Sequence, residues 1–174
     1  EKGERSVQIA LPNTKLDIFE FVYFARPDSE LLGQSVYEVR KNFGIRIARV
    51  GEDITIASYG RMLHECLAAA DDLAVMNISA EVLDLRILVP LNKATLLDSV
   101  RKTGRFLVVQ EECAHGFGAH LIASVADEAL EYIRAPCIPL LSSPCSFAPP
   151  PRFWEFHVPS KDSIVEQVQQ LIIE

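Results

Sequence analysis

The residues best suited to chemistry stand together just after an apolar segment at 106–109. Two carboxylates, Glu111 and Glu112, are followed by His115, and a glycine turn then opens a helix. Open α/β sheets place ligands or partners where a strand feeds such a turn. Neighbouring side chains at a strand end point to opposite sides, so the two carboxylates cannot act as acid and base on one face. One of them is available to cap the following helix or to meet a basic partner.

His115 could titrate near neutrality and act as a general acid or base. The sequence supplies it with neither a nucleophile nor an orienting carboxylate, and the phosphate-loop, dinucleotide, serine-hydrolase and zinc-protease motifs are absent. Gly116-Phe117-Gly118 is too short to be a phosphate loop by itself; its glycines are expected to let the backbone turn tightly into the helix. We therefore expect no catalytic or cofactor-binding residue, and no activity of this chain alone.

A zinc site is the other chemistry these residue types suggest. Cys113 and His115 sit together, and Cys145 and His157 follow downstream. Structural zinc sites usually present closely spaced ligand pairs in each half, and only one half comes close here. We therefore expect no metal.

None of the cysteines belongs to a C-x-x-C pair, and the chain is long enough to build an adequate core. Reduced thiols are expected rather than a disulfide framework. His64 and Cys66 are two residues apart in a predicted helix and share no face, so both are expected to be packing residues. The four cysteines are Cys66, Cys113, Cys137 and Cys145.

Apolar strands and amphipathic helices follow one another from about residue 45 onward. Nearly continuous apolar runs indicate parallel strands covered on both faces. The sequence therefore predicts a three-layer α/β sandwich with a mostly parallel five-stranded sheet. Strands are expected at 45–50 (an edge strand), 54–57, 82–85, 106–109 and 137–141, and helices at 61–74, around 96–100, at 118–132 (with Leu121, Ile122, Val125 and Leu130 inward) and at 163–173.

Residues 1–44 read as a separate β-β-α appendage. β-prone segments occupy 6–11 and 17–25, and a capping-box helix is expected at 33–43. Two strands and a helix cannot bury their apolar faces alone. We expect one face of the second strand to pack on the α/β domain or on a second copy of the chain. That face is either Phe19, Phe21 and Tyr23 or, on the opposite side, Val22 and Phe24.

The stretch at 142–159 is rich in proline and aromatic residues, which excludes regular secondary structure. Two interpretations stay open. The stretch packs across the domain's own surface, or Phe153 and Trp154 form a docking surface, since aromatic residues are enriched in interface cores.

The overall charge and hydropathy exclude two classes of partner. The net charge is −7, and no dense cluster of Lys and Arg is present, which argues against nucleic-acid binding. No apolar run approaches the roughly 20 residues needed to span a bilayer. We expect a cytoplasmic protein.

The pattern GEDITIASYGRML, AEVLDLRILVPL, LLDSVRKTGRFLVVQEE, GFGAHL and APCIPLL closely resembles the C-terminal domain of the β subunit of 2-oxoacid dehydrogenase E1 components. This is the last domain of the transketolase-like enzymes that use thiamine diphosphate. The resemblance covers about 45–174. His120 and Ser146 depart from it, because the family usually has an acidic residue and a proline there.

Residues 19–44 resemble a different family. LDIFEFVYFARPDSELLGQSVYEVRKNFG is similar to the joining region of glutamine phosphoribosylpyrophosphate amidotransferase. That family's nucleophile and phosphoribosyl-binding loop are absent. The chain therefore resembles a chimera of an amidotransferase-like fragment (1–44) and a transketolase C-terminal-like domain (45–174).

The resemblance to the E1 β subunit implies a non-catalytic domain that is used for subunit association and for docking the small binding domain of the E2 core protein. For this chain it implies a homo-oligomer or an assembly with a partner subunit. Thiamine diphosphate and Mg²⁺ would belong to other domains of the parent family. The alternative is a part of a split thiamine-dependent enzyme that needs other subunits. The candidate interface residues are Glu111, Glu112, His115, Phe117, Phe153, Trp154, Phe21 and Tyr23.

Overall fold

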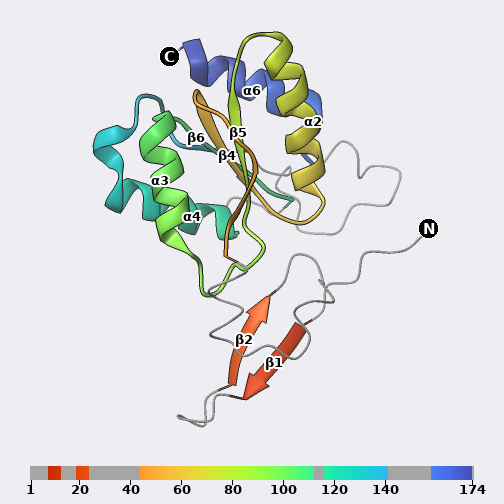
Figure 1. Ribbon diagram of the computed structural model, residues 1–174, viewed down its shortest axis with the longest axis vertical. Helices are drawn as coiled ribbons and strands as arrows, with labels where there is room; N and C mark the ends of the chain where they lie inside the picture. The colour runs from red at the N-terminus through yellow and green to blue at the C-terminus, as the bar shows by residue number, and fades with distance from the viewer. Residues whose placement is uncertain (1–7, 13–18, 24–43, 112–115, 141–157, 174) are drawn as a thin grey trace, which may run out of the picture.

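The computed structural model describes residues 8–12, 19–23, 44–111, 116–140 and 158–173 (Figure 1). Its larger sheet has five strands in the order β3-β5-β4-β6-β7. β4 is parallel to both β5 and β6, β6 is parallel to β7, and only the edge strand β3 runs antiparallel to its neighbour β5. The strands are β3 (Arg46–Arg49), β4 (Ile54–Ser58), β5 (Ala80–Asp84), β6 (Phe106–Val109) and β7 (Ile138–Leu140). The mostly parallel five-stranded sheet predicted from the sequence is confirmed.

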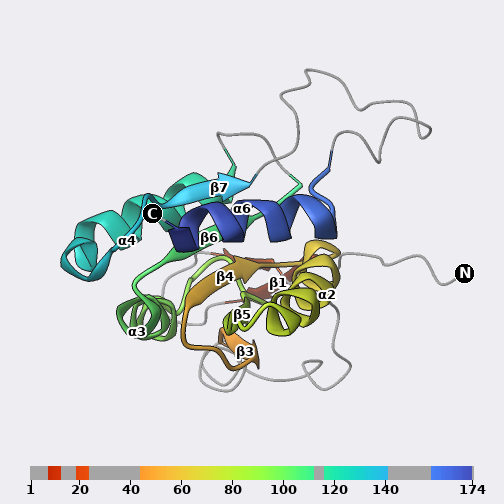
Figure 2. The ribbon, with the colours of Figure 1, turned by 90° about the horizontal axis from the view of Figure 1, so that it is seen from above.

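Helices cover both faces of this sheet, which makes three layers (Figure 2). α2 (Met62–Val75) and α6 (Lys161–Ile173) pack on one face. α3 (Lys93–Thr103) and α4 (Phe117–Glu128) pack on the other. Gly104 ends α3 in the left-handed conformation, with φ of 70°, and its N–H donates to Val100 O.

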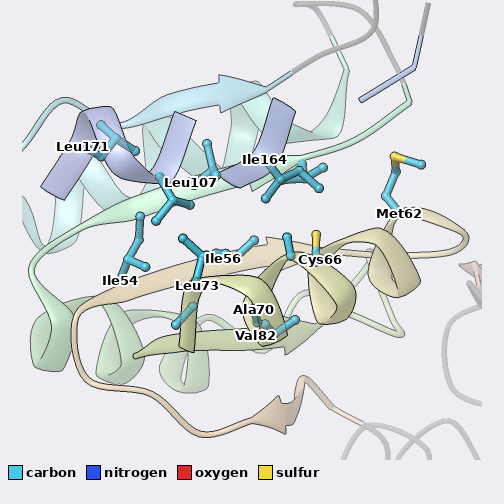
Figure 3. Close-up of a cluster of buried hydrophobic side chains, with 14 of the residues drawn as sticks. Ile54, Ile56, Met62, Cys66, Ala70, Leu73, Val82, Leu107, Ile164 and Leu171 are labelled. Atoms are coloured by element: carbon cyan, nitrogen blue, oxygen red, sulfur yellow. The ribbon is translucent and has the colours of Figure 1, made fainter. Parts of the chain in front are cut away.

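Alternate residues of the central strands supply the two halves of the core. Ile54 and Ile56 of β4 face α2 and α6, where Figure 3 shows them beside Leu107, Leu73 and Leu171. Each of these side chains is almost fully removed from water. Burial of a large apolar side chain contributes roughly 1.5–3 kcal/mol, so this layer is a main source of stability. The other half of the core contains Ala57, Leu83, Leu85, Leu96, Leu97, Val100, Phe106, Val108, Leu121 and Val125.

The first described residues form a separate two-stranded sheet. β1 (Gln8–Pro12) pairs antiparallel with β2 (Phe19–Tyr23), with Ala10 opposite Phe21 and Gln8 opposite Tyr23. Both strands expected near the N-terminus are therefore present. The helix expected at 33–43 lies outside the described residues.

β3 and β4 follow one another through a short turn at 50–53, as the strands expected at 45–50 and 54–57 predict. One expectation about the α/β part is corrected. The helix expected at 118–132 ends at Glu128, because Ala129 leaves helical backbone geometry with φ of −144°. A 3₁₀ turn, η2 (Leu130–Tyr132), follows and leaves Leu130 66% exposed, so the prediction that Leu130 faces inward was wrong.

Candidate functional site

The carboxyl ends of β4, β5 and β6 meet at one edge of the sheet, because the three strands are parallel. The chain leaves β4 toward α2 on one face and leaves β6 toward α4 on the other. In open α/β sheets, ligands and partners bind beside the point where successive connections go to opposite faces. The candidate site is therefore the turn after β4 together with the turn after β6.

Gln110, the residue after β6, is a buried polar side chain at this edge, only 1% exposed. Its Oε1 accepts a hydrogen bond from the backbone N–H of Gly118 at 2.6 Å. The Tyr59 hydroxyl lies 3.5 Å from the same oxygen and donates to it. One amide thus connects the end of β6, the first turn of α4 and the residue after β4.

An ion pair ties the same two turns together on the surface. Arg61 Nε lies 3.1 Å from Glu111 Oε1, and the two side chains are 48% and 37% exposed. Exposed pairs of this kind contribute about 0–1 kcal/mol, so this pair links the two turns but adds little to the stability of the fold. The expectation that one of the two carboxylates meets a basic partner is met by Glu111. Glu112 and His115 lie outside the described residues.

Three aromatic rings stand beside these polar contacts and are called here the aromatic cluster (Tyr59, Phe117 and His120). Phe117 packs edge-on against Tyr59, with ring centroids 6.4 Å apart and an interplanar angle of 85°. The His120 ring lies 5.6 Å from Phe117 at a tilt of 50°. Tyr59 and Phe117 are half-buried, and His120 is exposed. Phe117 and His120 are on the first turn of α4, and Tyr59 is the residue that directly follows β4.

Cys66, one of the two cysteines in the described part of the chain, lies near the start of α2 and is not reactive. Cys66 on α2 is buried, and this burial raises the pKa of its thiol from 9.0 to about 12, although Ser58 opposes the shift by hydrogen bonding. Nucleophilic chemistry needs the thiolate, so Cys66 is a packing residue, as expected. His64 is exposed on the outer side of α2, and the expectation that it packs in the interior was wrong.

The remaining candidate residues are not brought to this edge by the described structure. Phe153 and Trp154 lie outside the described residues. Phe21 and Tyr23 lie on β2, whose backbone alone is described. Within the described ranges, no group of three His, Cys, Asp or Glu residues could hold a metal ion. No described helix is long and apolar enough to cross a membrane.

A second polar cluster, at the amino edge of the sheet, was missed by the sequence reasoning. Glu81 on β5 is 1% exposed, and its carboxylate is paired with the Lys102 ammonium on α3. Thr55 Oγ1 lies 2.7 Å from Ser99 Oγ and 2.8 Å from Thr103 Oγ1, all three buried. The available signal was an acidic residue inside an otherwise apolar strand. These contacts satisfy one another and join α3 to the sheet.

The chain is similar in sequence to one known protein family and to several individual proteins. The family described as "Transketolase, C-terminal domain" matches residues 44–164. The pyruvate dehydrogenase E1 component subunit beta of Bacillus subtilis is 36% identical over 127 residues, which cover 72% of this chain and 39% of that protein. The mitochondrial subunit beta-2 of the same component from Oryza sativa is 46% identical over 92 residues, covering 52% of this chain and 24% of that protein. The chain thus spans less than half the length of these relatives.

Solved structures share the fold. A split-gene transketolase, described as an inactive beta4 tetramer, superposes on this chain with a TM-score of 0.66 at 24% sequence identity. The superposition covers 74% of this chain and 42% of the transketolase chain. The 2-oxoglutarate:ferredoxin oxidoreductase of Magnetococcus marinus superposes with a TM-score of 0.55 at 16% sequence identity. The superposition covers 78% of this chain and 21% of the oxidoreductase chain. At these identities the likeness concerns the fold alone.

Proposed function

The chain belongs to the transketolase C-terminal domain family, and we propose that it acts as a non-catalytic association domain. The observation that carries this proposal is the aromatic cluster at the carboxyl edge, where the rings of Tyr59, Phe117 and His120 pack against one another beside β4 and on the first turn of α4. Aromatic residues are enriched in the cores of protein interfaces, and rigid presentation lowers the entropy lost on binding. The edge thus has the properties of a docking surface.

The polar groups beneath this surface support the same interpretation. Gln110 binds Gly118 N–H, and Arg61 is paired with Glu111, so these groups are engaged in shaping the two turns. A general acid, a base or a nucleophile would instead need a side chain aimed at a reacting atom.

We favour a second copy of this chain as the partner. The other candidate is a different subunit of the same complex. The relatives found by sequence carry names of subunits of the pyruvate dehydrogenase E1 component. Docking of the small binding domain of an E2 core protein would extend the same proposal to a third protein. In each case Phe117 is the described residue that we expect to contribute most, because a half-buried aromatic anchor loses little entropy on binding.

Sedimentation equilibrium of the full chain tests the proposal. We expect concentration-dependent association, and Phe117→Ser should weaken it by about tenfold or more. The matched control is Val75→Ser, which also removes an exposed apolar side chain (84% exposed), but at the end of α2 near the amino edge. The control should associate like the unchanged protein. Association that is lost equally in both variants would contradict the choice of surface, and a strict monomer would contradict self-association.

The alternative function is part of a split thiamine-diphosphate-dependent enzyme, favoured by the names of the relatives. Mg²⁺ takes several oxygen ligands, and the described part of the chain has no group of three His, Cys, Asp or Glu residues that could hold a metal ion, while Glu111 is paired with Arg61. In such an enzyme the cofactor would therefore be held by the other subunits. We expect no thermal shift with thiamine diphosphate and Mg²⁺. A bound ligand at a hundred times its Kd would add about 2.7 kcal/mol of stability and would favour the alternative.

An origin of residues 1–44 from an amidotransferase-like fragment also remains our proposal. It is supported by the β1–β2 hairpin and by the family match, which begins at residue 44. We propose that this segment is held by the α/β part or by a second chain, as its short two-stranded sheet requires. Limited proteolysis at increasing protein concentration is the measurement. Cleavage within 1–44 that is equally fast at every concentration would argue against the second chain.

A further inference from the structure

Helix α4 begins without a capping side chain of its own. Its N-cap residue is Gly116, which has no side chain, and no side-chain hydrogen bond is made from that position. The first N–H groups of a helix have no partner within the helix, and a buried one left unpaired is costly. Gly118, the second residue of α4, is buried and would have this problem.

Gln110 provides the missing cap from outside the helix. Its Oε1 lies 2.6 Å from Gly118 N and accepts the hydrogen bond that a Ser or Asp at the N-cap would normally accept. The side chain comes from the end of β6, eight residues earlier in the chain. The direction in which α4 leaves the sheet is therefore tied to a strand end by one amide.

The fit between Gln110 and Gly118 is sterically specific. A Cβ added to Gly118 would lie 2.6 Å from Gln110 Oε1 and 3.0 Å from its Cδ. Such contacts are too short, so the amide occupies the space that a side chain would take. The lack of space explains the glycine at this position, because φ is not in the left-handed region there; Gln110 makes the shortest contact, and Val108 Cγ1 would also lie 3.0 Å from the added Cβ.

The same oxygen reaches the aromatic cluster. Tyr59 Oη is 3.5 Å from Gln110 Oε1, and the Tyr59 ring packs against Phe117, the residue before Gly118. Displacing the amide would therefore remove a contact at the start of α4 and a contact of the Tyr59 hydroxyl together. Gln110 Oε1 is thus an acceptor shared by both sides of the aromatic cluster.

We propose that Gln110 is a positioning residue that sets the geometry of the docking surface by capping α4 at Gly118 and holding Tyr59. This inference rests on the proposed function, since it assigns the residue that orders the surface used there. Gln110 acts through Phe117 and Tyr59 and need not touch the partner.

The test compares three variants of the full chain. Gln110→Ala removes the acceptor, and Gln110→Glu keeps an acceptor of the same reach, which the helix N-terminus favours as an anion. The matched control is Ser99→Ala, which removes a buried hydrogen bond to Thr55 at the opposite edge of the same sheet. The readouts are the hydrogen exchange of the Gly118 amide and the association constant from sedimentation.

We expect Gln110→Ala to lower the protection of the Gly118 amide by about tenfold or more and to weaken association by a similar factor. Gln110→Glu should restore both to within about threefold of the unchanged protein. Ser99→Ala should change neither, although it also removes a buried hydrogen bond.

Two results would overturn the proposal. One is equal association of Gln110→Ala and Ser99→Ala, which would mean that Gln110 has only a structural role. The other is a Gln110→Glu variant that behaves like Gln110→Ala, which would mean that the acceptor is not what matters. If the unchanged protein does not associate at all, the proposed function fails by itself. The exchange of the Gly118 amide then still decides whether Gln110 positions α4.

Discussion

Removal of the Lys102 ammonium should reveal how strongly the amino edge of the sheet depends on one charge. The carboxylate of Glu81 is 1% exposed and is paired with Lys102, whose side chain is 34% exposed. A second carboxylate, Glu52, lies 3.8 Å from the same nitrogen. Lys102→Met keeps most of the apolar stem but leaves Glu81 buried without its cation.

The expected loss follows from the burial of the partner that remains. Removing one member of a fully buried pair costs about 3–5 kcal/mol, because an uncompensated charge stays in the interior. Lys102 is a third exposed, so water can partly replace it, and Gly51 N–H remains 3.4 Å from Glu81 Oε2. We therefore expect a loss of about 2–3 kcal/mol in the free energy of unfolding.

Urea unfolding at neutral pH, followed by circular dichroism, measures this loss. The matched control is Lys93→Met, which breaks the exposed pair between Lys93 and Glu128 (2.9 Å; side chains 44% and 39% exposed) and should cost no more than about 1 kcal/mol. The double variant Lys102→Met/Glu81→Gln should regain part of the loss, since it removes the orphaned charge. Equal losses in Lys102→Met and Lys93→Met, or no recovery in the double variant, would refute the reasoning.

Three further predictions concern single side chains. Because burial raises the pKa of Cys66 from 9.0 to about 12, the unfolded chain loses a proton between these pH values that the folded chain keeps. Stability should therefore fall by about 1 kcal/mol per pH unit across this range, relative to Cys66→Ala measured in the same buffers. Gly118→Ala should cost about 1–3 kcal/mol. In a Gln110→Ala background the cost should be smaller, because the shortest contact is gone and only Val108 Cγ1, 3.0 Å from the added Cβ, remains close; additive losses in urea unfolding would contradict the packing described. Gly51→Ala should lower the melting temperature more than the other substitutions in this paragraph, because its Cβ would lie 2.2 Å from the Ala80 carbonyl carbon. A melting temperature near that of the unchanged protein would disprove this contact.

Hydrophobic patterning was sufficient to predict the sheet, because burial is determined by local runs of apolar residues. β4 and β6 are completely buried, and both were expected at nearly their observed bounds. The end of α4 was not predictable in this way. Leu130 continues the apolar spacing, but the backbone of Ala129 leaves the helix one residue earlier and turns Leu130 outward.

Two buried polar contacts, Gln110–Gly118 and Glu81–Lys102, could not be predicted from the hydrophobic pattern either. Gln110 and Gly118 are eight residues apart and belong to different elements, so their pairing depends on the angle between β6 and α4. Glu81 and Lys102 are 21 residues apart and meet only because α3 returns across the sheet. The sequence marks such residues as exceptions to an apolar run, while the partner of each is decided by tertiary structure.

The two edges of the sheet satisfy their buried polar groups in different ways, and this difference bears on function. At the amino edge, charged and hydroxyl side chains pair with one another and fasten α3 to the strands. At the carboxyl edge, the buried amide of Gln110 binds the backbone of a turn, so its effect is to fix where Phe117 stands. A contact of the first kind joins elements of the core, and losing one partner destabilises the fold, whereas a contact of the second kind gives one surface a defined shape. Variants at the amino edge should therefore change stability without changing association per folded molecule, and Gln110→Ala should change both.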